Sequence, residues 1–226
     1  MTDAAQALVK VVAGRLSTWG GRWSLDLKGP RLDAAAFTVA FASASRFLGK
    51  APLSTSAEEA ARLRAAGLTW PIGHIGFDEA ARMALLVKAA ESVSEAEQVS
   101  LVEDLYRQGE NRERQSILRA LPLLPRPERF LALAVESCRT SVQPIFEAIA
   151  CENPYPTAHF PDLNFNQMVL KALFIEVALD RIIDLERRIT KELRRMAKDY
   201  ASERAAAGRS IPKDIALLEQ LRVESP

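Results

Sequence analysis

Apolar side chains recur along most of this chain at the three- and four-residue spacing that is typical of amphipathic helices. Leu8, Val12 and Leu16 would share one face of the first helix. From Asp78 to Thr140 the same spacing predicts a series of helices that follow one another with very short joints. Because short joints make neighbouring helices pack antiparallel, the pattern predicts a chain built of packed helix pairs.

Local start and stop signals agree with this pattern. The sequences Ser-Ala-Glu-Glu at 56–59 and Ser-Glu-Ala-Glu at 94–97 are capping boxes, in which a hydroxyl and a carboxylate each bind a backbone N–H of the first helical turn. Gly67 and Gly109 would end the two helices that begin there, and Asn111 could cap the next helix.

Period-two alternation is convincing at one place only, where Trp23, Leu25 and Leu27 alternate with polar residues. One extended segment cannot form a sheet, so we expect a strap across the helices. We find no fixed repeat. The predicted fold class is all-α, an irregular right-handed stack of antiparallel helix pairs (a HEAT-like α–α superhelix or a multi-helix bundle), with residues 1–226 forming a single domain.

Composition narrows the class of protein. The chain has 226 residues, of which 48% are hydrophobic, and its 30 basic and 29 acidic side chains leave a net charge of +1. This balance offers no field that would attract nucleic acid, so we expect no nucleic-acid partner.

No uncharged stretch, Ala34–Ser45 included, approaches the ~18 residues of a membrane span. The N-terminus lacks the basic leader of a secretory signal. We therefore expect a cytoplasmic protein that is not an integral membrane protein.

The segment from Thr140 to Glu176 is the densest in polar and conformationally special residues. Three prolines between residues 154 and 161 predict an extended, rigid connection around Tyr155 and His159. Rigid loops that present polar side chains are common at functional sites, although they also serve as structural corners. The sequence leaves both interpretations open.

The helix predicted over Leu163–Val177 is apolar nearly all round, so we expect it to be the central helix of the domain. Asn164, Gln167 and Lys171 form its one polar stripe, which could line a pocket. Asn166 lies apart on the apolar side. A buried amide there needs hydrogen bonds, which predicts a clamp between this helix and the preceding loop.

Lys171 is the most informative residue of the stripe, because an ammonium on a mostly buried helix needs a carboxylate, a phosphate or water. Glu147 and Glu152 are the nearest candidate partners in sequence. A salt bridge would make the lysine structural, whereas a pocket would make it a ligand-binding residue, and we favour the pocket. The predicted ligand-binding residues are Glu147, Glu152, Asn153, Tyr155, His159, Asn164, Gln167 and Lys171.

Other recognisable chemistry is missing from the sequence. There is no phosphate-binding glycine loop, dinucleotide fingerprint or nucleophile elbow. Cys138 and Cys151, taken with His74 and His159, match no metal-ligand spacing. The arginines between 181 and 195 alternate with acidic residues, which favours a salt-bridged surface over a phosphate site. We therefore expect no catalytic residue, no metal and no cofactor.

Three long runs in the second half of the chain are specific enough to carry a family resemblance. They are Arg-Ala-Leu-Pro-Leu-Leu-Pro at 119–125, Val-Gln-Pro-Ile-Phe-Glu-Ala-Ile-Ala-Cys-Glu-Asn-Pro-Tyr-Pro at 142–156 and Phe-Asn-Gln-Met-Val-Leu-Lys-Ala-Leu-Phe at 165–174. These runs resemble the EboA-domain family of bacteria, most strongly from residue 111 to residue 218.

The resemblance implies a biological context rather than a mechanism. Ebo clusters encode a metabolic pathway that includes a prenyltransferase, and in cyanobacteria the cluster is linked to moving a sunscreen-pigment precursor toward the periplasm. No chemistry is established for the family, so no catalytic residue carries over.

We expect a non-catalytic binding or scaffolding protein that supports the synthesis or export of a small metabolite, with other ebo-pathway proteins or the metabolite as partners. The alternative is a helical enzyme or small-molecule carrier with a pocket between the Asn153–Pro161 loop and the Leu163–Val177 helix. A scaffold should expose an apolar patch, whereas an enzyme should have a deep polar pocket around Lys171.

Overall fold

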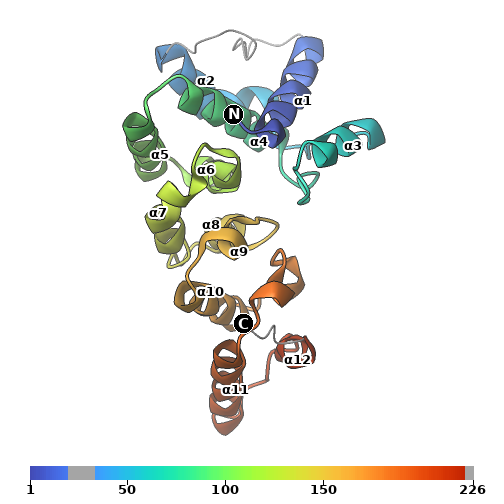
Figure 1. Cartoon of the computed structure of the whole chain (residues 1–226), viewed down its shortest axis with the longest axis vertical. Coiled ribbons are helices and arrows are strands. Elements are labelled where there is room, and N and C mark those ends of the chain that lie inside the picture. Colours follow the sequence, from blue (N-terminus) through green and yellow to red (C-terminus); the bar gives the residue numbers. More distant parts are fainter. Residues whose placement is uncertain (20–33, 222–226) are drawn as a thin grey trace. The chain divides into compact units, whose positions relative to one another are not determined.

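The computed structural model describes residues 1–19 and 34–221 of the chain. Within these residues the chain forms twelve α-helices and four short 3-10 helices, and the only β pairing is an isolated bridge between Pro52 and Gly76 (Figure 1). The all-α prediction is confirmed. The predicted extended strap at Trp23–Leu27 lies outside the described residues.

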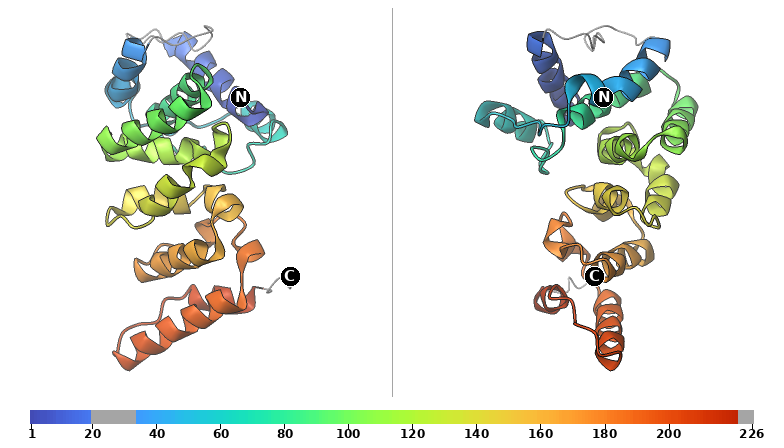
Figure 2. Two further views of the ribbon diagram at one scale, coloured as in Figure 1. Left: turned by 60° about the vertical axis from the view of Figure 1, so that its left-hand side comes forward. Right: turned by 180° about the vertical axis from the view of Figure 1, so that it is seen from behind.

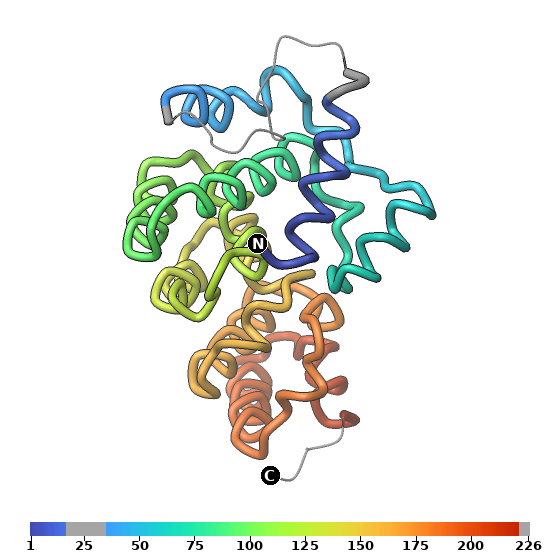
Figure 3. Tube along the Cα trace, turned by 45° about the horizontal axis from the view of Figure 1, so that its top comes forward, coloured from blue at the N-terminus to red at the C-terminus, as the bar shows by residue number. Residues whose placement is uncertain are grey.

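The chain packs as two compact units, Met1–Leu133 (unit 1) and Ala134–Pro226 (unit 2). A single cooperative domain and a right-handed superhelical order both stay predictions. The helices of unit 1, whose path Figure 3 follows, are α1 (Asp3–Trp19), α2 (Ala34–Leu48), α3 (Ala57–Ala65), α4 (Phe77–Glu91), α5 (Glu95–Gln108), α6 (Asn111–Ala120), η1 (Leu121–Leu123) and η2 (Pro127–Phe130), and α7 (Leu131–Ser137) continues into unit 2.

Both predicted capping boxes are present. The Ser56 hydroxyl accepts a hydrogen bond from the Glu59 N–H at 3.2 Å, and the Glu59 carboxylate accepts one from the Ser56 N–H at 2.8 Å. The box at 94–97 has the same two bonds. After α3 the chain turns at Gly67, whose φ of +91° lies in the region that favours glycine. The start of α6 differs by one residue, since its N-cap is Glu110.

The most enclosed helix of unit 1 is α4, in which thirteen of fifteen residues are buried. It contacts α1, α2, α5 and α6. We expected the helix at Leu163–Val177 to be the central one. That expectation is wrong, because one side of that helix is exposed, as described below. An apolar pattern shows which side chains can be buried, but the neighbouring helices decide which of them are.

Charged residues are buried on α4 together with the apolar ones. The carboxylate of Asp78 is fully buried and lies 3.2 Å from Arg82 Nη1 on the same helix and 2.5 Å from Arg112 Nε on α6. The Glu79 carboxylate lies 2.5 Å from Arg119 Nη1, also on α6. The pairs with Arg112 and Arg119 join α4 to α6, and all three arginines compensate carboxylates that could not otherwise be buried.

Unit 2 contains the remaining elements of the described chain. They are α8 (Gln143–Ala150), α9 (Tyr155–His159), α10 (Asp162–Phe174), η3 (Leu179–Arg181), η4 (Leu185–Arg188), α11 (Lys191–Ala206) and α12 (Ile215–Gln220). The last two helices pack against each other, and α11 also contacts α10 (Figure 2). Phe146, Tyr155 and Phe165 are fully buried at the centre of this unit.

The proline-rich connection is not extended as predicted, because it contains the single helical turn α9. Pro154 occupies the N-cap and Pro156 the first turn, where a missing N–H loses no hydrogen bond. Pro154 and Pro156 therefore begin the short helix α9.

Candidate functional site

One side of α10 is buried and the other is exposed. Phe165, Met168, Val169, Ala172 and Leu173 are buried. On the opposite side, Leu163 is 63% exposed and Phe174 is 64% exposed. Leu163, Gln167, Leu170 and Phe174 follow the four-, three- and four-residue spacing of one helix side, which we call the α10 outer face. The helix is therefore not enclosed on all sides by other parts of the protein, contrary to the prediction from its apolar composition.

Two cavities of unit 2 flank the outer face. The smaller cavity has a volume of about 270 Å³, and its polar lining includes Asn164, Gln167, Lys171 and Arg139. The larger cavity has a volume of about 660 Å³ and is lined by Arg139, Thr140, Ser141, Gln143, Leu170, Lys171, Phe174, Ile175 and Tyr200. Arg139 and Lys171 line both cavities, and none of the described lining residues is Asp or Glu.

Lys171 has a structural role as well as a place in the cavities. Its Nζ donates hydrogen bonds to the backbone carbonyl oxygens of Cys138, at 2.6 Å, and Thr140, and it lies 5.1 Å from the centre of the Phe146 ring. Since these carbonyls follow the end of α7, the ammonium caps the C-terminus of that helix. An ammonium has three N–H donors, so one remains for a ligand or water. Burial lowers the pKa of Lys171.

The salt bridge that we weighed as the alternative to a pocket would have joined Lys171 to Glu147 or Glu152, but a different cation pairs with these glutamates. Arg181 on η3 takes this role, with Nη1 2.8 Å from the Glu147 carboxylate and Nε 2.7 Å from the Glu152 carboxylate. The hydrogen bonds to Glu152 and Glu147 raise the pKa of Arg181. Neither glutamate is among the described residues that line the two cavities.

Asn153, Tyr155 and His159 build the turn around α9. The Asn153 side chain is buried, donates to the Ala148 carbonyl at 3.0 Å and accepts from the Tyr155 N–H at 3.0 Å. The Tyr155 ring is fully buried, 4.7 Å from the ring of His159. Of the eight predicted ligand-binding residues, the structure thus brings Asn164, Gln167 and Lys171 to one cavity.

The predicted clamp at Asn166 is not formed. Its side chain is buried, and its Oδ1 has no hydrogen-bond partner within the described part of the chain. Arg188, rather than Asn166, is a side chain that holds the 153–161 segment, since it donates to the carbonyls of Thr157, at 2.6 Å, and Phe160, at 2.7 Å.

Sequence reasoning missed Arg139 and Tyr200. Arg139 lies between α7 and α8, two-thirds exposed, and Tyr200 lies on α11. The periodic pattern contains no signal that would bring these two residues to Lys171, because all three lie on different elements.

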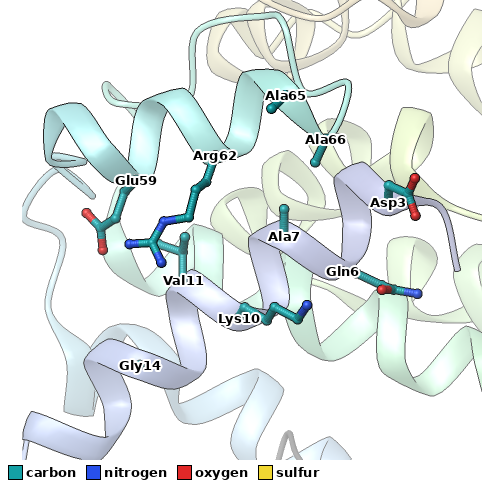
Figure 4. Close-up of a pocket in the computed structure, with 10 residues that line it drawn as sticks. All are labelled: Asp3, Gln6, Ala7, Lys10, Val11, Gly14, Glu59, Arg62, Ala65 and Ala66. Atoms are coloured by element: carbon teal, nitrogen blue, oxygen red, sulfur yellow. The ribbon is translucent and has the colours of Figure 1, made fainter.

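Unit 1 has a cavity of its own, of about 570 Å³, between α1 and α3 (Figure 4). Small side chains, among them Ala7 and Ala65, leave the space between the helices. Its charged lining residues are of both signs, namely Asp3, Lys10, Glu59 and Arg62. No predicted site residue lies in this cavity.

Comparison with known proteins identifies the family. The sequence model of the family described as metabolite traffic protein EboA matches residues 6–219, which covers nearly all of both units. The chain belongs to the EboA family. No curated protein and no solved structure matches it. Across residues 1–19 and 34–221, none of the helices combines the length and apolarity that crossing a membrane requires.

The chemistry that this EboA-family chain offers at α10 is cationic and hydrogen-bonding. Two cations, amide groups and hydroxyl groups face the cavities beside apolar walls. Burial raises the pKa of the Cys138 thiol to about 12, so it is a protonated thiol at neutral pH rather than a nucleophilic thiolate. Such a surface can bind and orient a molecule.

Proposed function

We propose that this EboA-family chain acts in the cytoplasm as a non-catalytic binding protein that supports the synthesis or export of a small metabolite, and that it binds this metabolite beside α10. The observation that carries the proposal is the pair of cavities that meet at Arg139 and Lys171. Their volumes, about 270 and 660 Å³, are close to or within the ~300–1,000 Å³ of typical small-molecule sites.

The side chains near the cavities that could act as acids or bases already bind other groups of the protein, which favours binding over catalysis. A general base must be able to reach the proton that it removes. Glu147 and Glu152, the nearest carboxylates that we predicted, are held by Arg181, and the ammonium of Lys171 is bonded to two backbone carbonyls. An enzyme that used one of these three groups would need to release it first, whereas a carrier needs none of them to move.

A protein partner of the same pathway is a second candidate, favoured by the exposure of Leu163 and Phe174. Leu163 is not among the residues that line the two cavities, so it separates the two candidates. A scaffold would use Leu163 as an apolar contact, whereas a metabolite held in the larger cavity would not touch it.

The test uses a strain that lacks the protein and compares its small-molecule extract after complementation. Ser141→Trp would fill the larger cavity from an exposed position, and Ser100→Trp on the exposed surface of α5 is the matched control. We expect Ser141→Trp to fail in restoring the extract profile at an unchanged melting temperature, and Ser100→Trp to restore it. Restoration by Ser141→Trp would refute the site. Failure of Leu163→Ser, with Ser141→Trp active, would assign the outer face to a protein partner.

A further inference from the structure

The described charged side chains that line the two cavities beside Lys171 are all basic. Arg139 and Lys171 are present in both linings, and no carboxylate is present among the described lining residues of either. The cavity between α1 and α3 provides a contrast, since Asp3 and Glu59 there balance Lys10 and Arg62. Arg139 pairs with Glu136, which lies outside both linings, so the described charged groups that face the cavities are all positive. Such a lining attracts anions, and the site beside α10 is therefore electrostatically suited to a negatively charged group.

Both cations have donors to offer. The guanidinium of Arg139 is two-thirds exposed, and its hydrogen bond to Glu136 is a surface pair three residues apart, of a kind that contributes little. A guanidinium has five N–H groups, so four remain to bind a second anion. Lys171 keeps one N–H beyond the two that bind the carbonyls of Cys138 and Thr140.

The larger cavity adds an apolar wall next to these cations. Leu170, Phe174 and Ile175 supply aliphatic and aromatic surface, and Tyr200 supplies a ring with a hydroxyl group. Phe174 keeps 64% of its surface exposed, an unusual state for a phenylalanine, and a bound apolar group would cover it.

We propose that the site takes a free amphipathic anion, with a carboxylate, sulfate or phosphate group at Arg139 and Lys171 and an apolar body along Leu170, Phe174 and Ile175. This inference rests on the proposed function and names its ligand class. A neutral apolar molecule would not use the remaining N–H donors of Arg139 and Lys171, and a small inorganic anion would leave the apolar wall exposed.

The test compares two fluorescent probes with the same aromatic skeleton. 8-Anilinonaphthalene-1-sulfonate carries an anionic group, and N-phenyl-1-naphthylamine lacks it. We expect the sulfonate to bind the full chain about tenfold more tightly, since a charge-assisted hydrogen bond is worth about that factor. Arg139→Gln should remove most of this difference and leave the affinity for the neutral probe unchanged.

Arg107→Gln is the matched control, because Arg107 forms the same exposed pair three residues from Asp104, at 2.8 Å. It should change neither affinity. Equal affinities of the wild-type chain for the two probes, or an unaltered preference in Arg139→Gln, would overturn the proposal. If Ser141→Trp abolishes complementation while the probes bind equally, the proposed function stands and the ligand class is wrong.

A last arm separates two sources of the anionic group. Sedimentation of the chain with phosphatidylglycerol vesicles, abolished by Arg139→Gln, would assign the site to a lipid headgroup and overturn binding of a free molecule. Sulfonate binding without vesicle sedimentation is the expected result.

Discussion

Replacing Asp78 by asparagine should destabilise unit 1 strongly. The carboxylate of Asp78 is fully buried and accepts hydrogen bonds from Arg112 Nε and Nη2 at 2.5 and 2.6 Å, from Arg82 Nη1 at 3.2 Å, and from the Ser45 hydroxyl. Burial alone would raise the pKa of Asp78, but the bonds from Arg112 and Ser45 outweigh it, so that the pKa lies below its usual range. The charged carboxylate is thus the form that the fold stabilises.

The magnitude follows from what asparagine leaves behind. Arg82 is only 2% exposed and would keep its charge without its partner, and removing one member of a buried pair costs ~3–5 kcal/mol. Since domains are stable by ~5–15 kcal/mol, the variant should lose about a fifth of its stability or more. Because the folded-state pKa of Asp78 is depressed, its contribution is present above the unfolded pKa near 3.8 and is lost as the pH falls through the folded value.

The assay is urea unfolding followed by tryptophan fluorescence, which reports on unit 1 because all three tryptophans lie within residues 1–133. Asp104→Asn is the control, since Asp104 is 55% exposed and pairs with Arg107 at the surface. That change should cost less than ~0.5 kcal/mol. A loss below ~1 kcal/mol in Asp78→Asn would refute the structural importance of the buried ion pairs.

Three further predictions concern the rest of the chain. If residues 1–226 form one cooperative domain, circular dichroism and tryptophan fluorescence should give the same midpoint of urea unfolding, although only circular dichroism reports on both units. Separate midpoints would contradict a single cooperative domain. Asn166→Leu should raise the melting temperature by a few degrees, since it removes a buried, unsatisfied Oδ1 that costs ~1–3 kcal/mol, and a clear fall would restore the clamp. Lys171→Met should destabilise unit 2 by ~1–3 kcal/mol, because the carbonyls of Cys138 and Thr140 lose a charged donor. Lys198→Met, at an exposed position, should cause no such loss. Equal melting curves for the Lys171→Met variant and the wild-type chain would exclude the capping role.

The sequence by itself determined most helix positions. The capping boxes at 56–59 and 94–97 and the turn at Gly67 lie where the pattern placed them, because each depends on atoms within one helical turn. The family runs at 142–156 and 165–174 also identified the EboA relationship that the match over residues 6–219 confirms. Signals that reach no further than a few residues can be read from a single sequence.

Only the tertiary structure decided which helix is enclosed and which charges meet. In α4, Asp78 and Glu79 are buried because arginines of α6 lie against them. No residue spacing along the chain predicts that these arginines are their partners. Lys171 was recognised as a cation in need of oxygen atoms, but backbone carbonyls more than thirty residues away supply them instead of Glu147 or Glu152. Burial and pairing are properties of neighbours in space, and these neighbours are fixed only when the helices pack.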